Sequence, residues 1–220
     1  MSVWFSEPKS GGGQHLGLSR ELIVRTAVRM LDEEGLAKLS MRKLAGQLGA
    51  APMSLYWHVP TKDALLELCL DELYAEIEPP DDDVEWDVAC RGFLYSLRYM
   101  GLRHPWCMQL LGKYVGVGPK AVAMSEALLS KLVAAGMSHI QASRAASSMS
   151  SYVIGWTLAE SNWQTEQNEF DTKPLREKYA ERFPIWTSLL AEAELWSLDK
   201  QFDFGLECVI AGVKARVPIR

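Results

Sequence analysis

The side chains best suited to recognition chemistry lie in one segment, residues 39–62. Arg42, Lys43 and Lys62 supply positive charge, and a guanidinium can form paired hydrogen bonds with a phosphate or with guanine O6 and N7. Ser54 can form a hydrogen bond with a base or a phosphate. This combination predicts a surface that binds nucleic acid, although Lys43 could also be a solvated surface charge.

An aromatic cluster of Tyr56, Trp57 and His58 follows Ser54 along the chain. We expect these three side chains to face the phosphate backbone of a nucleic acid. A purely structural role stays open for each of them. Tyr56 and Trp57 could pack in the core of a small domain, and His58 could cap its helix.

Two short helices must position these residues. Pro52 suits the first turn of the second helix, and Gly49 lies where the chain turns between the two. Ala45 is small enough to lie where the helices touch, and Leu55 can anchor the second helix through apolar contacts. The pattern predicts a helix-turn-helix.

Helical periodicity continues through the rest of the sequence. Ser19 and Thr61 are candidate N-caps of the flanking helices, and residues 79–83 form a Pro- and Asp-rich break. Beyond it, helical segments are predicted at about 86–103, 106–114, 119–135, 139–163, 174–181, 184–194 and 199–215. We therefore predict an all-α fold with a flexible N-terminal arm (1–18), a three-helix helix-turn-helix domain (19–64) and a helical C-terminal domain (65–220).

Composition and charge limit the possible functions. The chain has 220 residues, 48% of them hydrophobic, and neither a signal peptide nor a membrane span is expected, so we predict a cytoplasmic protein. Its net charge is -5, but residues 1–62 carry +3 and residues 63–220 carry -8, which favours nucleic-acid binding by the N-terminal part alone. Four cysteines match no metal motif and are expected to be small buried hydrophobes: Cys69, Cys90, Cys107 and Cys208.

The motif LSMRKLAGQLG followed by LYWHVPTKDALL resembles the DNA-binding domain of the tetracycline-repressor (TetR) family over about residues 19–77. The resemblance implies contacts with bases or phosphates of double-stranded operator DNA from Arg42, Ala51, Pro52, Met53, Ser54, Tyr56, Trp57, His58 and Lys62. The recognition helix here starts with Ala51-Pro52-Met53, and none of these side chains can form a hydrogen bond with a base, which departs from the family pattern. These residues could read thymine methyl groups or groove shape, so the operator should differ from that of the tetracycline repressor.

The resemblance extends to the C-terminal domain, where residues 202–212 match the F-x-F-G-L-E-x-x-I-x-G pattern of the family's last helix. It implies a ligand-binding and dimerisation domain. Candidate pocket residues are large apolar or aromatic side chains and one histidine: Trp86, Phe93, Leu97, Met100, His104, Trp106, Met108, Leu110, Trp156 and Trp163. Each could instead belong to an ordinary core.

Small residues in segment 139–163 suggest close helix packing, either with a second copy of the chain or within one chain: Ala142, Ala145, Ala146, Ser147, Ser150 and Gly155. A homodimer is expected, because helix-turn-helix proteins usually read two half-sites. In the tetracycline repressor, magnesium is held through a histidine, a threonine and a partner glutamate. Those positions align with Leu110, Lys113 and Ala159 here, so no metal or cofactor and a largely apolar ligand are predicted.

The expected function is that of a homodimeric repressor. A small-molecule effector would move the helix that begins at Thr61-Lys62 and release the operator. An activator or a regulator without a ligand has the same sequence features and stays possible. A helical enzyme or a protein-interaction bundle is a weaker alternative, since the chain has no glycine-rich phosphate loop, metal cluster or G-x-S-x-G motif.

Overall fold

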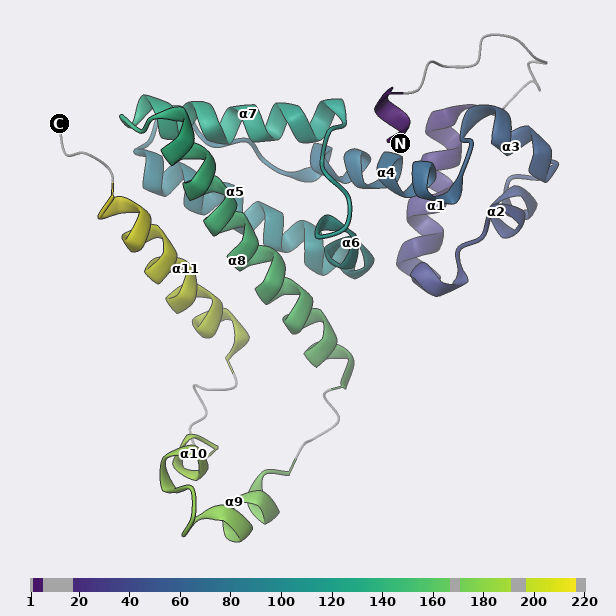
Figure 1. The fold of residues 1–220 in the computed structure, drawn as a ribbon. Coiled ribbons are helices and arrows are strands. Elements are labelled where there is room, and N and C mark those ends of the chain that lie inside the picture. The colour runs from purple at the N-terminus through teal and green to yellow at the C-terminus, as the bar shows by residue number, and fades with distance from the viewer. Residues whose placement is uncertain (1, 6–17, 167–170, 191–196, 217–220) are drawn as a thin grey trace.

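The computed structural model describes residues 2–5, 18–166, 171–190 and 197–216. Within these ranges every regular element is helical (Figure 1), which confirms the predicted all-α fold. None of the described helices is both long and apolar enough to cross a bilayer.

Local sequence signals define the N-terminal helices α1 (Arg20–Glu34), α2 (Met41–Gln47) and α3 (Pro52–His58), with a short 3-10 turn η2 (Leu36–Lys38) after α1. Ser19 Oγ accepts a hydrogen bond from Leu22 N at 3.2 Å, and Ser40 Oγ accepts one from Lys43 N at 3.2 Å. Such caps pair donors that the first helical turn leaves free. Gly49 has a φ of 62°, as the tight turn before α3 requires.

Helix α4 (Lys62–Leu73) joins these three helices to the rest of the chain, and a 3-10 turn η3 (Tyr74–Glu76) extends it. The body contains α5 (Trp86–Arg103), α6 (Pro105–Leu111), α7 (Pro119–Ala134), α8 (His139–Glu166) and α11 (Leu198–Lys214). Helix α8 contacts α5, α6, α7 and α11 and is the centre of the body (Figure 1). The short helices α9 (Lys173–Tyr179) and α10 (Pro184–Leu189) contact each other beyond the end of α8.

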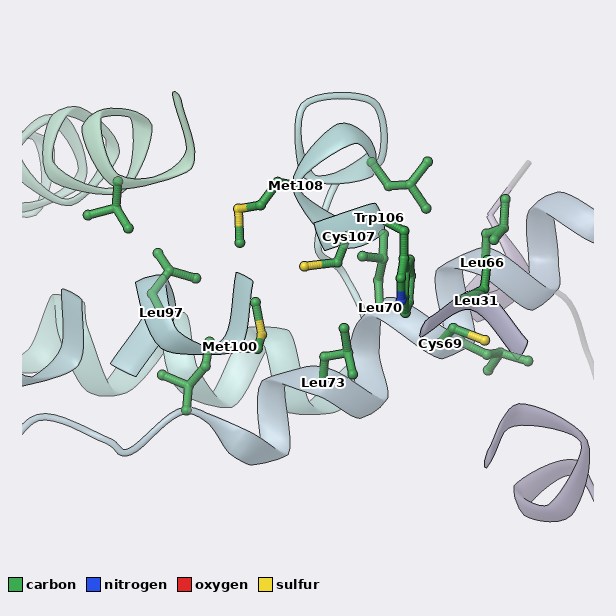
Figure 2. Packing of buried hydrophobic residues seen from close by; sticks show 14 of the residues in the cluster. Leu31, Leu66, Cys69, Leu70, Leu73, Leu97, Met100, Trp106, Cys107 and Met108 are labelled. Atoms are coloured by element: carbon green, nitrogen blue, oxygen red, sulfur yellow. The ribbon is translucent and has the colours of Figure 1, made fainter. Parts of the chain in front are cut away.

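The apolar core is continuous between the N-terminal helices and the body. Leu31 of α1 and Leu66 of α4 belong to the same cluster as Trp106 and Met108 of α6 (Figure 2). Burial of these side chains drives the association of α1, α4, α5 and α6. The predicted boundary at residues 64–65 therefore falls inside a packed region.

Helices α5 and α11 are joined by a row of polar contacts along their length. Four pairs make up this row: Asp87–Lys214, Arg91–Glu207, Tyr95–Asp203 and Arg98–Asp199. Residue numbers rise along α5 as they fall along α11, so the two helices are antiparallel. We call this row the α5–α11 ladder.

Arg98 also pairs with a residue of α8. Its side chain is 1% exposed, and Nε and Nη2 donate to the Glu160 carboxylate at 2.9 and 2.6 Å. The Phe202 ring lies 4.4 Å from its guanidinium carbon. Burial opposes the charge, but the hydrogen bonds to Glu160 and Asp199 outweigh it and raise the pKa of Arg98.

The N-terminal end of the chain returns to α4. Within the arm predicted over residues 1–18, Val3–Phe5 form the 3-10 turn η1, which contacts α4 (Figure 1). Residues 6–17 lie outside the described part of the chain.

Candidate nucleic-acid interface and ligand pocket

The contact between α2 and α3 has the geometry predicted for a helix-turn-helix. Ala45 and Leu55 are fully buried, and Ala50 N donates to Ala45 O at 3.0 Å across the turn. The small Ala45 side chain lets the two short helices approach closely. The buried Leu55 fixes one face of α3 to the core, so the opposite face must point outward.

The outward face of α3 is apolar and aromatic. Met53 is 70% exposed, Trp57 is 55% exposed and Tyr56 is 42% exposed. These exposures disfavour the alternative that Tyr56 and Trp57 pack in the core. A cluster of large exposed apolar side chains on one short helix marks an interaction surface. Ala51 and Pro52 are also exposed, whereas Ser54 and His58 are half-buried.

The three predicted cations differ in their surroundings. Arg42 is exposed on α2 and makes no ion pair with any residue that the structure describes. Lys43 pairs with Glu34 of α1. Lys62 Nζ donates to Leu39 O at 2.6 Å and to Leu36 O at 3.3 Å. Its ammonium therefore stabilises the chain that leads from η2 into α2, and Arg42 is the cation best placed for an external anion.

A hollow of about 300 Å³ lies between α5, α7 and α8. Phe93 and Leu97 are the two predicted pocket residues that line it. The rest of its wall is apolar or hydroxylated: Tyr74, Leu111, Met124, Ser125, Leu128, Leu129, Ser143, Ala146, Ser147, Ser150 and Ile154. This volume suits a small molecule, and its lining offers an apolar surface with hydroxyl groups on α7 and α8.

The other predicted pocket residues lie elsewhere. Met100, Trp106, Met108 and Leu110 are buried core residues. The Trp156 ring packs 6.3 Å from the Phe202 ring. Trp86 is half-buried and Trp163 is exposed at the end of α8. His104 contacts Asp32 and Glu76 rather than the hollow.

Family comparisons match both parts of the chain. The description "Bacterial regulatory proteins, tetR family" applies to residues 23–69, and "Tetracyclin repressor-like, C-terminal domain" applies to residues 78–217. The chain belongs to the TetR family. Its members that match here are transcriptional regulators, so this TetR-family protein is a DNA-binding regulator and not an enzyme.

Individual relatives span nearly the whole TetR-family chain. An HTH-type transcriptional regulator of Saccharopolyspora erythraea is 36% identical, covering 97% of this chain and 92% of the relative. The HTH-type transcriptional repressor DrrR1 of Streptomyces coeruleorubidus is 30% identical, covering 99% and 85%. The crystal structure of the Streptomyces coelicolor TetR-family protein ActR in complex with actinorhodin is similar with a TM-score of 0.83 and 32% identity, covering 92% and 98%.

Sequence reasoning missed the hydroxylated side of the pocket in this TetR-family protein. Ser147 and Ser150 belong to the small residues expected to pack against a second copy or within one chain; both line the hollow, and Ser147 also lines a groove between α8 and α11. Ala142 and Ala145 of the same stripe are buried within the chain. The spacing of Ser143, Ser147 and Ser150 places them on one helical face, and that was the available signal. No comparable pattern in the sequence predicts that Tyr74 lines the hollow, because it lies in the short turn η3 and not on a long helical face.

Proposed function

We propose that this protein is a homodimeric, cytoplasmic repressor that a small, largely apolar ligand releases from its operator. The observation that carries the proposal is the exposed face of α3, which presents Met53, Tyr56 and Trp57, together with the exposed Arg42 on the adjoining helix α2. A recognition helix presents such a face to the major groove. The repressor DrrR1 among the relatives supports the sign of regulation.

Recognition of bases should depend on apolar contacts at the start of α3. Ala51, Pro52 and Met53 can contact thymine methyl groups but cannot form paired hydrogen bonds with guanine. Arg42 can form such a pair with guanine or with a phosphate. Tyr56, Trp57 and His58 would contact the phosphate backbone of the DNA. Lys43 and Lys62 would contribute positive charge while holding α2 in place.

A second copy would bind along α8 and α11. A groove of about 860 Å³ between them is lined by Met137, Gln141, Ser143, Arg144, Ala145, Ser147, Ser148, Val209, Gly212, Val213 and Arg216. Phe204 of α11 is also exposed. Two copies joined here would present two α3 helices, as half-sites ~34–36 Å apart require. Sedimentation velocity tests this, because Val209→Asp should convert the dimer to monomers while Lys178→Asp should not.

Release by a ligand follows from the position of the pocket. Tyr74, in the turn that extends α4, and Leu111 of α6 both line the hollow. A ligand that fits the hollow better in one orientation of α4 would increase the fraction of molecules in that orientation. The DNA-binding helices, which α4 carries, would then change position. The ActR complex with actinorhodin supports small-molecule binding by this type of body. Leu110, Lys113 and Ala159 offer no magnesium ligands, and no metal-binding group occurs among the described residues.

Selection of bound DNA from a pool of random duplexes tests the proposal. The wild-type protein should enrich a palindrome, and an Arg42→Ala/Tyr56→Ala variant should not. Failure of the wild-type protein to enrich any sequence at moderate salt would contradict operator binding without ligand. Enrichment of a palindrome whose affinity never changes across a small-molecule library would instead favour a regulator that needs no ligand.

A further inference from the structure

The N-terminal turn η1 is docked on α4 by polar contacts. The backbone N of Val3 donates to Glu67 Oε2 at 3.3 Å, and the Ser2 hydroxyl donates to the same oxygen. Glu67 lies in the middle of α4, the helix that carries the DNA-binding helices. The first residues of the chain therefore hold the helix that must move if the body is to control α3.

The indole of Trp4 fits a prepared site. It lines a small hollow together with Leu70, Asp71, Tyr114 and Gly118, and the remaining volume is about 20 Å³. That volume holds about one water molecule, and the half-buried Trp4 side chain packs against the apolar core. A methyl group added at Gly118 would lie 2.2 Å from Asp71 Oδ1 and 2.8 Å from Trp4 Cζ2, so glycine lets both the Asp71 carboxylate and the indole approach this loop.

Acidic residues of α4 and η3 receive partners from different parts of the chain. Asp63 accepts from the Tyr114 hydroxyl at 2.7 Å, Asp71 accepts from Ala121 N at 2.9 Å, and Glu76 pairs with Arg103 at 2.7 Å. The body thus contacts α4 near its start, near its end and in η3. The described partners of Glu67, between these points, come from residues 2 and 3.

The Trp4 site and the ligand hollow share two side chains. Tyr74 and Leu111 line both. A ligand in the larger hollow would therefore touch two side chains that also line the Trp4 site. A displacement of Tyr74 or Leu111 by either occupant changes the space available to the other.

We propose that residues 2–5 are an intramolecular strap, in which Trp4 and the contacts to Glu67 restrain α4 against α7 and thereby set operator affinity. The restraint on α4 is independent of what the protein binds, whereas the effect on operator affinity rests on the proposed function. A fixed α4 holds the recognition helix α3 in one orientation. The entropy cost of ordering α3 on the DNA is then smaller, and the affinity for the operator is higher.

Two variants of the full chain test the strap. Trp4→Ala empties the site, and Phe5→Ala is the matched control because Phe5 is 71% exposed on the same turn. Hydrogen exchange of amides in residues 62–73 should be about tenfold faster in Trp4→Ala and unchanged in Phe5→Ala. Affinity for the selected operator at fixed salt should fall about threefold or more in Trp4→Ala alone.

Glu67→Ala tests the same restraint without touching the indole, and it replaces Trp4→Ala if that variant does not fold. It should accelerate exchange of the same amides. Equal exchange in the wild-type, Trp4→Ala and Glu67→Ala proteins would overturn the strap. Faster exchange with unchanged operator affinity would overturn its regulatory role. Faster exchange in a protein that binds no DNA would retain the restraint on α4 and refute the proposed function instead.

Discussion

His104 Nδ1 lies 2.7 Å from Asp32 Oδ1, and this contact joins the end of α5 to α1. Trp106 Nε1 of α6 donates to the same oxygen at 2.7 Å, while His104 Nε2 lies 3.1 Å from Glu76 Oε1. A residue expected in the ligand pocket therefore connects the body to the DNA-binding helices. Asp32 is the shared acceptor, so the joint depends on its carboxylate.

Replacement of Asp32 by Ala should destabilise the protein by about 1–3 kcal/mol, because Trp106 is only 4% exposed and its indole N–H would lose its partner. Urea denaturation measures the change. Glu33→Ala, at the next and exposed position of α1, is the control and should have little effect. Equal midpoints for the two variants would show that the joint adds nothing to stability.

Replacement of Arg98 by Met should cost about 3–5 kcal/mol, since it leaves the Glu160 carboxylate buried without its partner. The double variant Arg98→Met/Glu160→Leu should recover much of this loss. Arg91→Ala breaks an exposed pair of the α5–α11 ladder and should cost at most about 1 kcal/mol. Denaturation curves in which Arg98→Met resembles Arg91→Ala would contradict the buried-pair interpretation.

Arg42→Ala should weaken operator binding by about 1–3 kcal/mol if the guanidinium reads a base, with relaxed preference at one base pair. If it binds a phosphate, the loss should be similar for all sequences and the salt dependence should fall by about one ion. Titration of the selected operator at several salt concentrations separates these outcomes. Lys178→Ala on α9 is the control, and an Arg42→Ala protein that matches it would remove Arg42 from the interface.

Ser150→Trp should fill the hollow between α5, α7 and α8 with an indole and block it. An anilinonaphthalene sulfonate dye, which becomes fluorescent in apolar sites, should bind the wild-type protein and bind Ser150→Trp about tenfold more weakly. Ser188→Trp on the exposed surface of α10 should bind the dye like the wild-type protein. Undiminished dye binding by Ser150→Trp would place the dye site elsewhere.

The sequence was sufficient to predict features that depend on neighbours in the chain. The predicted caps Ser19 and Thr61 and the turn at Gly49, which has a positive φ, act within a few residues and agree with the structure. The family motif also placed Tyr56 and Trp57 on a helix whose exposed face the structure now defines. Local chemistry and a specific motif explain this agreement.

Contacts between distant residues could not be predicted in the same way. The family motif predicts that Lys62 contacts a base or a phosphate, but it does not predict that the Lys62 ammonium donates to the carbonyl of Leu39, 23 positions earlier in the sequence. His104 meets Asp32 across 72 positions. The spacing of apolar residues along the chain does not show which side chains of distant helices will meet. The contacts of Lys62 and His104 and the Trp4 site therefore become visible only in the three-dimensional structure.

The α5–α11 ladder has a consequence for how the protein responds to its own abundance. It fixes α11, which borders the groove for a second copy, to α5, which supplies Phe93 and Leu97 to the ligand hollow. If a ligand in the hollow shifts α5, the ladder would pass that shift to α11, and the proposed assembly and ligand binding would change each other's free energy by the same amount. Under that proposal ligand sensitivity would depend on protein concentration, and a cell that makes more of this regulator would also change the ligand dose at which it responds.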